Sequence, residues 1–193
     1  MIKTLLGYVK QYKRDTLLTP LFSALEVFME VLIPFITAAI IDKGIEVGNI
    51  NNVYKYGTIM LVMAMLSLLF GILAGKYAAS ASAGFAANIR LAQYEKIQQF
   101  AFSNIDKFST AGLVTRMTTD VTNLQNAYQM CIRIAVRAPL MLISSMVMCF
   151  FIHVQLSLIF VAAVLILGCV LALIVSKTMK LFDAAFTRYD ELN

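Results

Sequence analysis

Two carboxylates, Glu26 and Glu30, stand four residues apart inside the apolar stretch 16–41. At that spacing both side chains lie on one face of a helix. A carboxylate inside a bilayer is costly, and it usually faces a helix-bundle interior or a water-filled cavity. We therefore predict that Glu26 and Glu30 line a path for a small cationic or amphipathic molecule. The alternative is that they are neutral or hydrogen-bonded packing residues.

A second candidate lies in the polar stretch 103–125, which separates two long helical patterns. Leu113, Val114 and Met117 follow the spacing i, i+1, i+4 and so form one apolar stripe about a turn long. Arg116 flanks this stripe. A short helix with one apolar stripe is suited to docking on a soluble partner; the alternative is an ordinary turn between two antiparallel helices.

Polar residues at both ends of the stripe predict where the short helix begins and ends. Ser109 or Thr110 can cap its start. Thr119 or Asp120 can cap the helix that follows, and Asp120 is also four residues from Arg116, at ion-pair spacing. We therefore predict a separate helix over residues 109–119, with a break in the chain at each end.

Other reactive residue types lack the spacing that catalysis or metal binding needs. The three cysteines are far apart and show no CxxC or Cys/His pairing, so we expect buried, reduced thiols: Cys131, Cys149 and Cys169. Gly71 and Gly75 precede a lysine, but a phosphate loop needs four residues between its glycines. They are read as a helix-packing pair, and the chain is predicted to hold no catalytic, cofactor or metal site.

Composition sets the protein class. The chain has 193 residues, of which 60% are hydrophobic and 14% are charged, and its mean hydropathy is +0.79. A soluble domain has about a quarter charged residues, so this is predicted to be an integral, all-α membrane protein. The net charge of +5 fits the excess of basic residues on the cytoplasmic side of a membrane, and nucleic acid is not expected as a partner.

The elements that must position these residues follow from hydropathy and length. Residues 1–15 are basic and amphipathic, which suits a helix lying in the membrane interface; the alternative is a frayed tail. Four spans are predicted, and three of them are long enough to continue into the cytosol. Their ranges are 16–41, 54–106, 120–152 and 156–193. Basic residues near the N-terminus, over 76–137 and after 176 place both ends in the cytoplasm. Arg133 and Arg137, one turn apart, can reach headgroups or a neighbouring carboxylate.

Three segments resemble the type IV ABC exporters, in the order in which that family carries them. Residues 106–120 read DKFSTAGLVTRMTTD and resemble its first intracellular loop, although many members have Gly directly after the first Thr, where this chain has Ala111. Residues 133–140 read RIAVRAPL, and residues 26–45 read EVFMEVLIPFITAAIIDKGI. Residues 133–140 are similar to the heterodimeric multidrug branch of the family in particular.

The resemblance implies a role for the whole chain. It identifies residues 109–119 as a coupling helix that contacts ATP-binding domains, and the chain as the first four of six spans in one half of an exporter. ATP and Mg²⁺ would bind in the nucleotide-binding domain, outside this chain. The resemblance further implies a plasma-membrane location, a second transporter half (non-identical, with an identical half as the alternative) and efflux of multidrug or lipid-like amphipathic substrates. A self-contained four-helix channel or scaffold is the alternative function.

Overall fold

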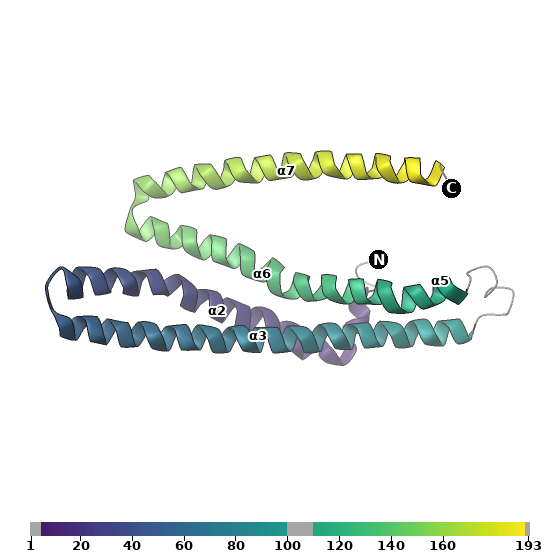
Figure 1. The fold of residues 1–193 in the computed structure, drawn as a ribbon, viewed down its shortest axis with the longest axis horizontal. Helices are drawn as coiled ribbons and strands as arrows, with labels where there is room; N and C mark the ends of the chain where they lie inside the picture. Colours follow the sequence, from purple (N-terminus) through teal and green to yellow (C-terminus); the bar gives the residue numbers. More distant parts are fainter. Residues whose placement is uncertain (1–4, 100–109, 192–193) are drawn as a thin grey trace. The chain divides into compact units, whose positions relative to one another are not determined.

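The computed structural model describes residues 5–99 and 110–191, with side chains over 5–99 and 111–179. These parts of the chain are helical apart from short turns (Figure 1). In chain order the elements are η1 (Gly7–Tyr12), α2 (Lys13–Ile40), η2 (Ile41–Ile45), α3 (Ile50–Gln98), α5 (Thr110–Thr115), η3 (Arg116–Asp120), α6 (Val121–Ile152) and α7 (Val154–Glu191). The all-α fold predicted from the sequence is confirmed, and four of these helical stretches are long and apolar enough to cross a membrane.

The chain divides into two compact units, residues 1–142 and 143–193. The first unit holds η1, α2, η2, α3, α5, η3 and most of α6. The second holds the end of α6 and α7, joined at His153, whose carbonyl accepts hydrogen bonds from the backbone N–H and the hydroxyl of Ser157. The apolar face of each long helix is largely exposed within the described residues, as expected for helices that meet lipid.

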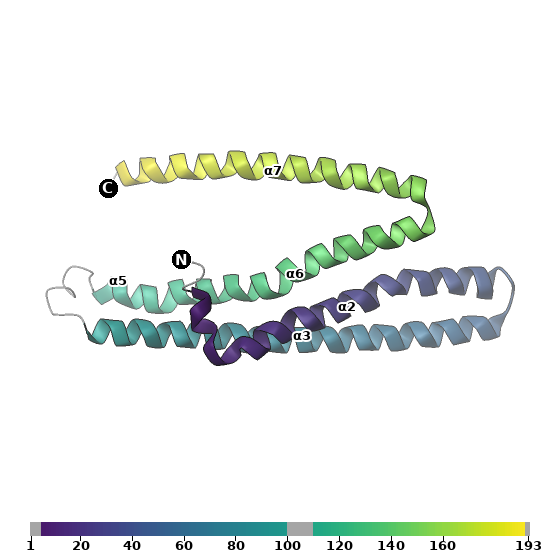
Figure 2. The same cartoon turned by 180° about the vertical axis from the view of Figure 1, so that it is seen from behind.

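Helices α2 and α3 lie side by side as an antiparallel pair (Figures 1 and 2). Gly48 takes a left-handed φ of +67° in the turn between them, a conformation that favours glycine. Asn49 then caps α3, because its Oδ1 accepts hydrogen bonds from the backbone N–H groups of Asn51 and Asn52. This cap is the reason that α3 begins at Ile50 rather than at the predicted residue 54.

Small residues allow α3 to pack closely against its neighbours. Ala74, Ala78 and Ala81 are fully buried on this 49-residue helix, and small side chains let helix backbones approach. At 1.5 Å per residue α3 is about 75 Å long, more than twice the thickness of a hydrocarbon core. One end of α3 therefore extends well beyond any membrane that the other end spans.

The N-terminal segment packs on α3 instead of forming one helix over residues 1–15. Lys10 has a φ of 40°, which kinks the chain within η1 and ahead of α2. Val9 is buried in a cluster with Phe85 and Ile89 of α3. Burying Val9 here offsets the strained backbone at Lys10. From residue 5 on, the chain forms η1 and the start of α2 rather than one helix, and its location in the membrane interface stays a prediction.

Candidate functional site

The two carboxylates of α2 meet an arginine of α6. Arg137 donates from Nη1 to Glu26 Oε1 at 2.9 Å, and from Nη2 to Glu30 Oε1 at 2.8 Å and Oε2 at 3.0 Å. Glu26 is 7% exposed. The spacing of Glu26 and Glu30 thus places both on one face of α2, as predicted. Lipid headgroups and a neighbouring carboxylate were the two partners expected for Arg137, and the structure shows carboxylates. The pairing also makes both glutamates hydrogen-bonded packing residues. Their role in a substrate path stays a prediction.

Two glycines of α3 make room for charged groups. A Cβ at Gly71 would lie 2.8 Å from Glu26 Oε1, which is too close, whereas a Cβ at Gly75 would lie an ordinary 3.6 Å from Arg133 Nη1. The Gly71 and Gly75 pair, predicted to pack helix against helix, instead lies beneath the charged ends of side chains from α2 and α6. A Cβ at position 71 would require the Glu26 carboxylate to shift from its present place beside Arg137.

The same residues border a groove of about 660 Å³ between α2, α3 and α6. Its polar border comes from Glu26, Glu30 and Arg133, and its apolar wall includes Leu68 and Ile72 of α3. A groove with charged groups at one place and an apolar wall beside them is suited to an amphipathic molecule.

The predicted coupling segment is helical, but it is not a separate helix. The elements α5, η3 and α6 follow one another without a gap, and Thr115 and Val121, which flank η3, both have helical backbone angles. The predicted cap at Thr119 or Asp120 is therefore wrong, because an N-cap residue has non-helical angles. The predicted cap residue Ser109 lies outside the described residues, as does the side chain of Thr110.

Three threonine hydroxyls of this segment bond back into the helix. Thr115 Oγ1 donates to Ala111 O at 3.1 Å, Thr118 Oγ1 to Val114 O at 2.8 Å, and Thr122 Oγ1 to Thr118 O at 2.8 Å. Threonines inside a helix commonly bond in this way to the carbonyl one turn earlier. The π-helical turn η3 accommodates the segment within one continuous helix.

The apolar stripe of this segment is accessible. Val114 is 60% exposed, and Leu113 and Met117 are half-buried. Arg116 and Asp120 are exposed beside them. The structure thus presents an apolar stripe flanked by charges at the end of the α3–α6 pair, which is a surface that a soluble domain can contact.

Arg90 is a residue at this segment that the sequence analysis missed. From α3, its Nε donates to the backbone carbonyl of Met117 at 3.3 Å, and its Nη2 donates to Thr122 Oγ1 at 3.1 Å. It therefore ties η3 and the start of α6 to α3. The available signal was a lone arginine in the amphipathic end of the second helix, but its partners are 27 and 32 residues away and no local pattern identifies them.

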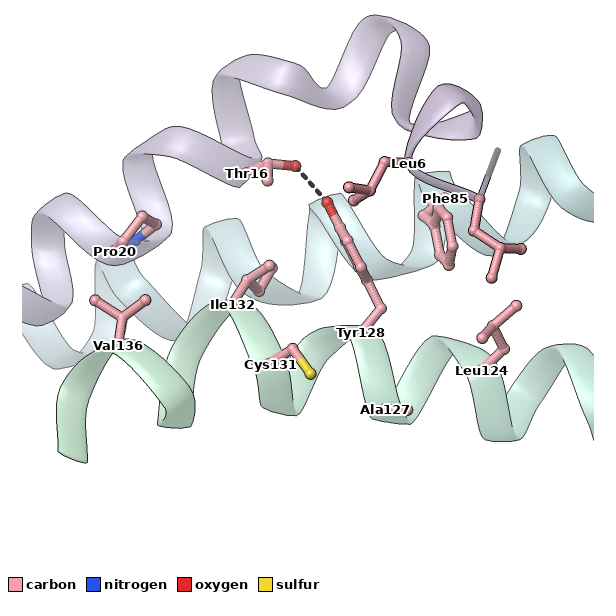
Figure 3. Close-up of a pocket in the computed structure, with 11 residues that line it drawn as sticks. Leu6, Thr16, Pro20, Phe85, Leu124, Ala127, Tyr128, Cys131, Ile132 and Val136 are labelled. Carbon is pink, nitrogen blue, oxygen red and sulfur yellow. Dashed lines mark hydrogen bonds between the residues drawn. The ribbon is translucent and has the colours of Figure 1, made fainter. Parts of the chain in front are cut away.

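A second cavity, of about 520 Å³ and almost entirely apolar, lies between the N-terminal segment, the start of α2, α3 and α6 (Figure 3). Thr16 and Tyr128 share a hydrogen bond of 2.8 Å across it. The ring of Tyr128 stacks on Phe85 with centroids 4.4 Å apart. Cys131 also borders this cavity and is exposed, as is Cys169, whereas both were expected to be buried. Within the described residues, no group of three His, Cys, Asp or Glu side chains is placed to hold a metal ion.

Comparison with known proteins gives the same family as the three motifs. Residues 16–193 match the family described as ABC transporter transmembrane region. The chain is 32% identical over 188 residues to the uncharacterized ABC transporter ATP-binding protein YfiB of Bacillus subtilis, covering 97% of this chain and 33% of that protein. It is 25% identical over 193 residues to the uncharacterized ABC transporter ATP-binding protein Rv1273c of Mycobacterium tuberculosis, covering 100% of this chain and 33% of that protein.

The chain thus spans about a third of the length of the curated relatives it matches. Its four apolar helices make it a multi-pass membrane protein, and the match over nearly its whole length confirms the resemblance carried by residues 106–120. The chain belongs to the ABC transporter transmembrane region family.

Proposed function

We propose that this chain is the membrane-spanning part of an ATP-driven exporter of amphipathic or lipid-like small molecules. The exporter lies in the plasma membrane, and both ends of this chain lie in the cytoplasm. A partner nucleotide-binding domain binds ATP and Mg²⁺ and hydrolyses the ATP. A second transporter half completes the pathway. This half is non-identical, because residues 133–140 resemble the heterodimeric branch. The relatives are named as ATP-binding proteins and are about three times as long as this chain, which supports the nucleotide-binding partner.

The observation that carries the proposal is the accessible stripe of Leu113, Val114 and Met117. It lies on a rigid, continuous helix that Arg90 ties to α3. A movement of the nucleotide-binding domain that displaces the stripe would therefore move two long helices, α3 and α6, and would not merely deform a loop. Switching of this kind needs rigid elements that move together and a contact point where the partner acts on them.

The groove beside Glu26 and Glu30 is the proposed binding site for the transported molecule. It offers charged groups to the polar end of a substrate and the apolar wall of α3 to its hydrocarbon part. Lipid around the bundle is the source from which such a molecule would enter.

Replacing the stripe tests the coupling role. In the full-length protein, Leu113→Asp with Met117→Asp should leave ATP binding intact and abolish both substrate-stimulated ATP hydrolysis and transport. Burying one such side chain contributes about 1.5–3 kcal/mol, so two carboxylates in place of the stripe should weaken docking at least a hundredfold. The measurements are nucleotide binding, ATPase rate and vesicle transport.

Thr119→Asp is the matched control, because Thr119 is exposed and points away from the stripe at helical spacing. It adds the same charge to the same segment and should preserve coupling. Normal transport by the double Asp variant would show that the segment is a plain connection between helices.

A further inference from the structure

The charges around the groove balance. Glu26 and Glu30 contribute two negative charges, and Arg133 and Arg137 contribute two positive ones, so the net charge of the four groups is zero. Burying net charge in a membrane is expensive, whereas balanced charge is tolerated. A ligand that adds a full positive or negative charge here would disturb this balance, and a ligand that carries both signs would preserve it.

The pairing between these groups is incomplete. Arg137 satisfies three carboxylate oxygens, but Glu26 Oε2 is buried and has no hydrogen-bond partner among the described residues. Only 9% of the Glu26 side chain is exposed. Arg133, one turn before Arg137, makes no ion pair within residues 5–99 and 111–179. A buried carboxylate oxygen without a partner costs free energy that a donor from a ligand would recover.

The two groups with open hydrogen-bonding capacity are held a fixed distance apart on α3. The Glu26 carboxylate lies over Gly71, and the Arg133 guanidinium lies over Gly75. Residues four apart on a helix are separated by about 6 Å along its axis. The groove therefore presents an acceptor and a donor of opposite charge about one helical turn apart, next to an apolar wall that includes Leu68 and Ile72.

We propose that this groove binds a zwitterionic amphipath, whose ammonium group contacts Glu26 and Glu30 and whose phosphate or carboxylate group contacts Arg133. The two charged groups of the ligand are joined by a short carbon bridge, as in the headgroup of phosphatidylethanolamine, and its hydrocarbon chain lies along α3. The proposal rests on the export function proposed above, because it names the substrate class of that same site. Arg133 is the residue that selects a zwitterion over a simple cation.

Binding of a matched lipid series to the full-length protein in detergent, without ATP, tests the proposal. The probes share the same two short acyl chains and differ in headgroup: phosphatidylethanolamine is zwitterionic, phosphatidylglycerol is anionic and ethylphosphatidylcholine is cationic. The native protein should bind the zwitterion about tenfold more tightly than either of the others, the effect of one charged hydrogen bond. Phosphoethanolamine without acyl chains shows whether the headgroup suffices or the lipid is needed.

Arg133→Gln is the decisive variant, because it removes a charge that makes no ion pair and so leaves the Arg137 cluster intact. It should weaken phosphatidylethanolamine binding about tenfold and shift the preference to the cationic lipid, and Arg133→Lys should restore the original order. Lys76→Gln removes the same charge from an exposed position next to Gly75 and should change nothing. An unchanged preference in Arg133→Gln, or a native protein that prefers the cation, would overturn the proposal.

The two proposals fail separately. Loss of zwitterion selectivity in a protein that still couples ATP hydrolysis to transport would refute the ligand class alone. Selective binding in a protein that shows no ATP-driven transport would refute the export function and leave the binding site standing.

Discussion

Arg137 changes what Glu26 and Glu30 can do. Two carboxylates alone would attract a cation, but the guanidinium between them cancels one of the two negative charges. The geometry that permits this depends on Gly71, since any side chain there would occupy the space of the Glu26 carboxylate. Gly75 is one turn away and has no such constraint. The two glycines therefore have different roles although they form one sequence pattern.

Substitution of these glycines by alanine separates the two roles. Gly71→Ala should lower the thermal unfolding temperature of the full-length protein, because its Cβ displaces the Glu26 carboxylate from Arg137, and overpacking of this kind costs about 1–3 kcal/mol. Gly75→Ala should be neutral or stabilising by up to about 1 kcal/mol, because alanine favours the helix and its Cβ meets only an ordinary contact. Equal unfolding temperatures for the two variants would mean that the carboxylate has other room to move.

At the scale of elements, the coupling segment is part of a continuous helix that is held from the side. The hydroxyls of Thr118 and Thr122 bond back along this helix, and Arg90 links η3 and the start of α6 to α3. The Arg90 contact joins the segment to an element distant in sequence. The stiffness of the proposed contact point thus depends on a residue outside the proposed docking surface.

Loss of the Arg90 tie should loosen η3 without unfolding the bundle. In Arg90→Ala, amide hydrogen exchange over residues 116–122 should rise about tenfold, the expected effect of losing hydrogen bonds from a charged group, and substrate-stimulated ATP hydrolysis should fall. Lys96→Ala removes the same charge from an exposed position on α3 and provides the control. Exchange that is unchanged over this segment would show that Arg90 does not stabilise it.

At the scale of the whole molecule, four apolar helical stretches alternate with segments of different charge. The turn after α2 has nearly balanced charges, and α3 carries three of its four basic residues, Lys76, Arg90 and Lys96, in its later half. The excess of Lys and Arg marks the cytoplasmic side of a membrane. The end of α3 and the coupling segment are therefore expected on that side, together with both ends of the chain.

Cysteine labelling tests this orientation. In a full-length protein with Cys131, Cys149 and Cys169 replaced by alanine, Asn49→Cys should react with a membrane-impermeant maleimide from outside the cell. Thr115→Cys, which is exposed, should react only after the membrane is opened. Labelling of both positions from the same side would contradict the predicted four-span arrangement.

Local patterns in the sequence determined much of this protein. Hydropathy and length predicted the long helices, and helical spacing placed Glu26 with Glu30 and Leu113 with Met117, because these features depend only on neighbours along the chain. Motif similarity over residues 106–120 predicted the family that the comparisons show.

Only the tertiary structure decided which faces meet. Arg137 reaches carboxylates 107 and 111 residues away, and Gly71 lies beneath one of them. Arg90 reaches a carbonyl and a hydroxyl across two helices. Sequence spacing also predicted a cap at Thr119 or Asp120, but the chain continues as a helix through η3 into α6. Thr and Asp side chains can either cap a helix or lie inside one. Which of the two occurs depends on the backbone conformation around them, and the residue types alone do not determine it.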